Sequence, residues 1–118
     1  MLRERPRTIE RLRSHLRVGD DACTTAVNIE EVVRGLRPSE VTRARRLFEG
    51  LVLIPFGPAE AWIAGHWRRE YATRGITLFQ SDCLVASAAL SVEARLATGN
   101  PNDFPMQEID VEHWPVGE

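Results

Sequence analysis

Two short apolar runs, each next to a helical pattern, restrict what this chain can fold into. Residues 51–55 (LVLIP) are apolar throughout, which is typical of a strand buried on both faces of a sheet. Residues 22–27 (ACTTAV) form a second, β-branched run that predicts another strand. Strands that alternate with helices favour a parallel sheet covered by helices on its faces. We therefore predict an α/β fold, a three-layer sandwich around a short central parallel sheet.

The helices are predicted from apolar residues spaced three or four positions apart. Ile9, Leu12 and Leu16 have this spacing, which predicts an amphipathic helix over residues ~6–18. Ile63, Trp67 and Tyr71 follow the same rule in a longer segment that begins near Pro58. The remaining expected elements are helices over 28–36, 38–50, 58–75 and ~81–94, and strands over 95–98 (RLAT) and 108–114 (EIDVEHW).

Composition limits the class of protein. A chain of 118 residues with 43% hydrophobic residues forms one domain with a buried core, and we expect that domain to span 1–118. No apolar run approaches the ~18 residues that span a bilayer, and the Arg-rich start lacks the apolar segment of a secretory signal. We therefore expect a cytoplasmic protein without a membrane segment. Cys23 and Cys83 stand singly in apolar stretches, which favours reduced, buried thiols over a disulfide or zinc site.

In a parallel sheet, ligand-binding side chains lie beyond the carboxyl ends of the strands. Three acidic residues of this chain are expected to lie in that region. Glu31 follows the run 22–27, Asp82 lies at the start of a helix, and Asp103 follows RLAT. Each alone has an ordinary explanation, since a carboxylate at a helix start is stabilised by the helix dipole. Together, three carboxylates repel one another unless a cation lies between them. Mg²⁺ and Mn²⁺ prefer such oxygen ligands and would promote hydrolysis of a nucleic acid backbone.

The same residues carry a family resemblance. The segment TAVNIEEVVRG, followed by SDCLVASAAL and LATGNPNDF, resembles the PIN-domain ribonucleases, in particular the VapC toxins of prokaryotic toxin–antitoxin pairs. The resemblance implies that Glu31, Asp82 and Asp103 match the second, third and fourth metal-site acids, with Thr98 and Asn100 supporting the last. It also implies a Mg²⁺- or Mn²⁺-dependent endoribonuclease that dimerises and is silenced by a cognate VapB antitoxin.

The chain departs from the family pattern at its beginning. Family members open with a short apolar strand that carries Asp-Thr-Ser, whose Asp is the first metal ligand, whereas this sequence begins Met1-Leu2-Arg3. We therefore expect a domain that is amino-terminally truncated relative to the family and lacks its central strand and first carboxylate. Asp20 and Asp21 lie in the turn before the second strand, at the opposite end of a parallel sheet from the site.

These observations leave three functional hypotheses. In the first, the chain is a metal-dependent ribonuclease toxin, and basic residues of the first predicted helix hold RNA phosphates. Those residues are Arg3, Arg7 and Arg11. In the second, the truncated chain is catalytically impaired and acts only as an antitoxin-binding or dimerisation module. In the third, the chain is an unrelated α/β domain whose acidic residues are helix caps and surface groups.

Overall fold

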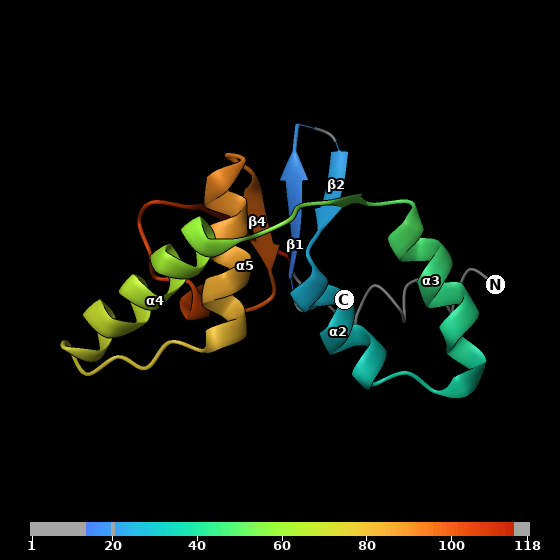
Figure 1. Cartoon of the computed structure of the whole chain (residues 1–118), viewed down its shortest axis with the longest axis horizontal. Helices are drawn as coiled ribbons and strands as arrows, with labels where there is room; N and C mark the ends of the chain where they lie inside the picture. Colours follow the sequence, from blue (N-terminus) through green and yellow to red (C-terminus); the bar gives the residue numbers. More distant parts are fainter. Residues whose placement is uncertain (1–13, 20, 115–118) are drawn as a thin grey trace.

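The computed structural model describes residues 14–19 and 21–114. In this part of the chain, a five-stranded sheet of order β3-β2-β1-β4-β5 is flanked by four α-helices (Figure 1). The strands are β1 (Ser14–Val18), β2 (Asp21–Thr24), β3 (Val52–Leu53), β4 (Arg95–Thr98) and β5 (Asp110–His113). The α-helices are α2 (Ala26–Arg34), α3 (Val41–Glu49), α4 (Pro58–Ala72) and α5 (Gln80–Ser91), with single 3₁₀ turns η1 (Pro38–Glu40) and η2 (Pro101–Asp103). The predicted α/β class is confirmed.

The central strand β1 corrects one prediction. Residues 14–18 form a strand and not the end of the helix expected over ~6–18; residues 6–13 lie outside the described part. β1 pairs antiparallel with β2 on one side and β4 on the other, with Leu16 opposite both Cys23 and Leu96. The expected gap at the centre of the sheet is therefore filled by these residues. Hydrogen bonding on both sides explains why this short segment is extended, since an unpaired row of backbone groups is unfavourable.

The other strands agree with a parallel sheet. β2 is parallel to β3, and β4 is parallel to β5; because β1 opposes both β2 and β4, these four strands share one direction. β3 differs from its prediction, since it has only two residues and both are 55% exposed. The expectation of burial on both faces is wrong because β3 is an edge strand.

The helices α2, α4 and α5 form close to where they were predicted. Thr25 begins α2 as an N-cap, and the predicted helix over 38–50 is divided into η1 and α3. α4 packs along α5 (Figure 1), and both contribute to one hydrophobic core with the sheet residues Leu16, Cys23 and Leu96. Cys83 is likewise buried, and both cysteines are free. In the described part of the chain, no helix has the length and apolar character to cross a membrane.

Candidate functional site

Several polar residues lie at the end of the sheet formed by the carboxyl ends of β2 and β4, which we call the edge below. β2 and β4 end at this edge with Thr24 and Thr98, and α2 and η2 follow them directly. The α5 helix leads back to the start of β4 through a short turn, so its first residues lie toward the same edge (Figure 1). Residues 24–28, 82 and 98–103 are thereby gathered on one side of the molecule.

The polar residues of this edge are unusually buried. The buried polar residues of the described chain are Thr24, Thr25, Asn28, Asp82, Ser87 and Thr98. All except Ser87, which lies within α5, belong to the edge just defined. Burying polar groups costs free energy unless they are hydrogen-bonded. A cluster of buried polar residues at strand ends is therefore a candidate ligand-binding site.

Thr25 and Asn28 form the best-defined contact of this edge. The Thr25 hydroxyl donates to Asn28 Oδ1 at 2.8 Å and accepts the Asn28 backbone N–H at 3.3 Å. Thr25 is 0% exposed and Asn28 is 3% exposed, so these bonds are shielded from water. They fix the first turn of α2, which carries Glu31 one turn later.

Among the acidic residues that the structure describes, Asp82 is the most withdrawn from solvent, at 9% exposure in the first turn of α5. The residue before the helix is Phe79, and no side chain caps α5. A carboxylate in this first turn interacts favourably with the helix dipole. Asp82 thus lies at a buried edge of the sheet that is rich in side-chain oxygens.

Asp103 and Glu31 approach the edge from two other elements and are both half-buried. Asp103 ends η2, where its backbone N–H donates to the Asn100 carbonyl at 3.0 Å. The Asn100 N–H in turn donates to the Thr98 hydroxyl at 3.1 Å. The two residues predicted to support Asp103 are therefore linked to it by hydrogen bonds. Glu31 lies on α2, which contacts α5.

The three acids lie toward this edge but do not form a preformed metal site. Among residues 14–19 and 21–114, no three Asp, Glu, His or Cys side chains lie close enough together to hold a metal ion. The assignment of Glu31, Asp82 and Asp103 as ligands therefore stays a prediction. The donor set suits Mg²⁺ or Mn²⁺, which need only one or two carboxylates beside water and phosphate oxygens. Arg3, Arg7 and Arg11, the predicted phosphate contacts, lie outside the described residues.

His15 is a polar residue of the central strand β1, and it is not among the site residues predicted from the sequence. Its ring packs edge-on against Trp114, with ring centroids 4.3 Å apart. Burial lowers the pKa of His15, the neighbouring charge of Arg17 lowers it further, and Glu112 partly opposes them. His15 is therefore neutral near pH 7 and packs as an aromatic ring.

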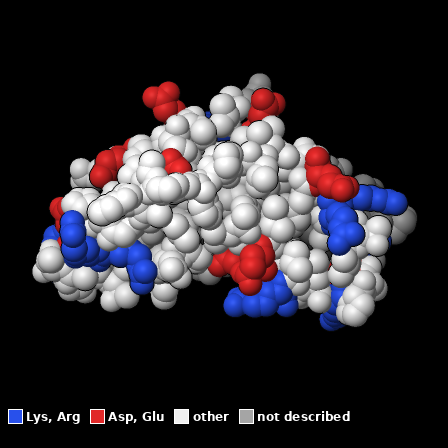
Figure 2. Space-filling view, viewed as in Figure 1, with Lys and Arg blue, Asp and Glu red and all other residues white. Residues whose placement is uncertain are grey.

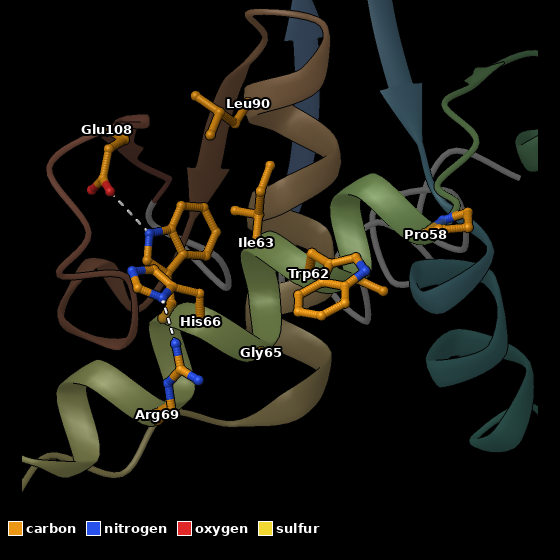
Figure 3. Close-up of a pocket in the computed structure, with 10 residues that line it drawn as sticks. Pro58, Trp62, Ile63, Gly65, His66, Arg69, Leu90 and Glu108 are labelled. Atoms are coloured by element: carbon orange, nitrogen blue, oxygen red, sulfur yellow. Dashed lines mark hydrogen bonds between the residues drawn. The ribbon is translucent and has the colours of Figure 1, made fainter.

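A groove on α4 is a second surface feature. It has a volume of about 870 Å³, and Figure 3 shows Pro58, Trp62, Gly65 and His66 following one another along the helix beside it. Trp62 is 80% exposed, whereas Trp67 on the inner face of α4 is 3% exposed. The division of these tryptophans between surface and core was predictable from their spacing. The groove itself was not, because Leu90 and Glu108 complete it from distant parts of the chain.

Comparisons with known proteins agree with this architecture. The profile of the family described as "PIN domain" matches residues 1–110. Among solved structures, the chain is similar to the crystal structure of VapBC2 from Rickettsia felis bound to a DNA fragment from their promoter. That likeness has a TM-score of 0.66 and 22% identity, and covers 78% of this chain and 74% of the other. At this identity it supports the fold alone. No curated protein matches the chain.

Proposed function

The chain belongs to the PIN-domain family, and from this premise we propose that it is a metal-dependent endoribonuclease toxin of the VapC type. PIN domains are generally nucleases. The observation that supports the proposal is the burial of Asp82 in the first turn of α5, together with the buried polar residues at the carboxyl ends of β2 and β4. In open α/β sheets, ligands bind at this end of the strands.

In this proposal, Glu31, Asp82 and Asp103 hold Mg²⁺ or Mn²⁺ through carboxylate oxygens. The metal would neutralise phosphate charge and acidify a bound water. Thr98 and Asn100 keep η2 in place, because their hydrogen bonds set the turn that ends at Asp103. Thr25 and Asn28 hold the start of α2 and thereby the helix on which Glu31 lies.

The RNA substrate is proposed to contact basic residues around this edge. Figure 2 shows arginine side chains toward both ends of one face and at its lower margin, with acidic side chains beside and between them. At one end, Arg43, Arg45 and Arg46 of α3 are exposed. Arginine contacts with phosphate position a nucleic acid without reading its sequence. An RNA substrate is also the reason that we propose a cytoplasmic location.

Two protein partners belong to the proposal, a VapB-type antitoxin and a second copy of the chain. The structural neighbour was crystallised as a VapBC2 assembly, which motivates the antitoxin. For the second copy we propose the groove of α4, because Trp62 and Arg69 lie seven residues apart beside it. If two α4 helices meet antiparallel, Trp62 of each copy faces Arg69 of the other, a favourable cation–π pair.

The test of catalysis compares two aspartates at opposite edges of the sheet. Asp82→Asn removes the buried carboxylate, and we expect it to abolish Mn²⁺-dependent cleavage of a fluorescent single-stranded RNA while the circular dichroism spectrum is unchanged. Asp21→Asn is the control, because Asp21 is exposed at the start of β2, far from the site in the strand direction. Equal cleavage by both variants would refute the assignment.

The binding-module alternative is distinguished by the same samples. If the wild-type protein neither cleaves RNA nor binds Mn²⁺ in a calorimetric titration, the catalytic proposal fails. A stable complex with the product of a small neighbouring gene would then favour a module that only docks its antitoxin. If the wild-type protein binds Mn²⁺ and Asp103→Asn does not, the shared metal site is supported.

A further inference from the structure

Two side chains of α4 hold the loop that follows the candidate site. The Trp67 indole N–H donates to the Glu108 carboxylate at 3.1 Å, a contact that Figure 3 shows crossing from α4 to the loop. One helical turn later, the Tyr71 hydroxyl donates to the Pro105 carbonyl at 3.2 Å. These bonds join residues 41 and 34 positions apart in the sequence.

The loop held in this way, residues 104–109, begins directly after Asp103. Phe104, Met106 and Ile109 turn into the core, at 5%, 2% and 9% exposure. Pro105 and Glu108 are exposed, and they are the positions that α4 binds. The loop is thus anchored by apolar side chains on one side and by hydrogen bonds to α4 on the other.

Asp103 depends on such anchors because its own element is short. η2 has three residues, and the Asp103 and Phe104 backbone N–H groups donate to the Asn100 and Pro101 carbonyls at 3.0 Å each. A single 3₁₀ turn has weak hydrogen-bond geometry. The segments on either side of the turn therefore help to set the direction of the Asp103 carboxylate.

We propose that Trp67 and Tyr71 are positioning residues that set Asp103 relative to Asp82. The inference rests on the proposed function, in which both acids serve one metal. α4 contacts the elements next to both acids, because it packs along α5, which carries Asp82, and binds the loop that follows Asp103. The Arg74 guanidinium lies 4.2 Å from the centre of the Tyr71 ring and further limits its motion.

Glu108 offers the sharpest test because it is exposed and its replacement leaves the core intact. Glu108→Leu removes the acceptor of the Trp67 N–H, and Glu108→Gln keeps an acceptor oxygen while removing the charge. We expect Glu108→Leu to lower kcat and Mn²⁺ affinity about tenfold with KM unchanged, since small displacements of catalytic groups are costly. Glu108→Gln should retain the wild-type values.

Two further measurements separate positioning from general stability. Amide hydrogen exchange at residues 104–109 should quicken in Glu108→Leu and in Tyr71→Phe, while exchange in α5 and the melting temperature stay close to wild type. Ser91→Ala is the matched control, because it also removes one side-chain hydrogen bond, from Ser91 Oγ to the Ala88 carbonyl at 2.7 Å, but at the far end of α5. It should leave kcat and Mn²⁺ affinity unchanged.

The outcomes distinguish this inference from the function on which it rests. If Asp103→Asn behaves like the wild-type protein, the proposed metal site is wrong. If Asp103→Asn is impaired and Glu108→Leu matches the wild-type protein in kcat and Mn²⁺ affinity, the site stands and the positioning role is overturned. Equal losses in Glu108→Leu and Glu108→Gln would also overturn it, because the charge and not the hydrogen bond would then be responsible.

Discussion

The hydroxyl of Thr25 is the single group whose removal tests most directly how the edge of the sheet is built. Thr25→Val keeps the shape of the side chain and removes the oxygen that caps α2 and donates to Asn28. Loss of an N-cap costs about 1 kcal/mol. The buried Asn28 oxygen left without this donor costs about 1–3 kcal/mol. Together the free energy of unfolding should fall by about 2–4 kcal/mol, a large part of the about 5–15 kcal/mol that stabilises a domain.

This loss can be measured in two ways and has a matched control. Urea unfolding followed by circular dichroism should show a lower midpoint with an unchanged slope, and the melting temperature should fall by about 8–16 °C. Thr73→Val is the control, because the exposed Thr73 hydroxyl donates to the Glu70 carbonyl at 2.6 Å where water can replace it. We expect its effect to stay within about 0.5 kcal/mol. Equal losses in both variants would refute the buried network.

Two other predictions concern protonation and association. Because burial lowers the pKa of His15 from its usual 6.5, the unfolded chain binds the proton more readily, so this contribution to stability is present above pH 6.5 and is lost as pH falls below it. In His15→Phe, which keeps a ring against Trp114, the decrease in stability between pH 7 and 5.5 should be smaller, and an identical pH profile would contradict the assignment. Trp62→Ser should convert the proposed dimer to a monomer in light scattering. Phe79→Ser, which removes an aromatic ring at 60% exposure outside the groove, should not; dissociation by both variants, or by neither, would exclude the groove as the interface.

The sequence predicts the elements whose pattern is complete within one segment. In α4, Ile63, Trp67 and Tyr71 recur at helical spacing, and all three face the core or its margin. The strand RLAT has the predicted bounds, Arg95–Thr98, because polar and turn residues limit it on both sides. These patterns depend on neighbours only a few positions away, so the sequence displays them directly.

β1 could not be predicted because its stability comes from distant partners. Leu16 fits the helical spacing of Ile9 and Leu12 and also fits the alternation of a strand. What decides between the two is pairing with Cys23 and with Leu96, the second of which lies 80 positions away. A five-residue segment gains more from hydrogen bonds on both sides than from its own weak helical preference.

The candidate site was predictable in outline and not in detail. Alternating strands and helices place Glu31, Asp82 and Asp103 near one sheet edge, because the carboxyl ends of parallel strands coincide. Whether the carboxyl groups converge depends on side-chain directions, and in the described residues no three of them form a metal-binding group. The hydrogen bonds from Trp67 and Tyr71 to the loop after Asp103 depend on the tertiary packing of α4. The local sequence pattern therefore could not predict them.

The two faces of α4 connect the proposed association with the proposed catalysis. The outer face carries Trp62 beside the groove, and the inner face carries Trp67, which binds Glu108. Glu108 also lines the groove, so a second copy docked at Trp62 would lie next to the contact that holds the loop after Asp103. Docking would then restrict the loop further. If so, Trp62→Ser should also weaken Mn²⁺ binding at concentrations where the wild-type protein is dimeric, and Mn²⁺ affinity that does not depend on protein concentration would separate the two roles of this helix.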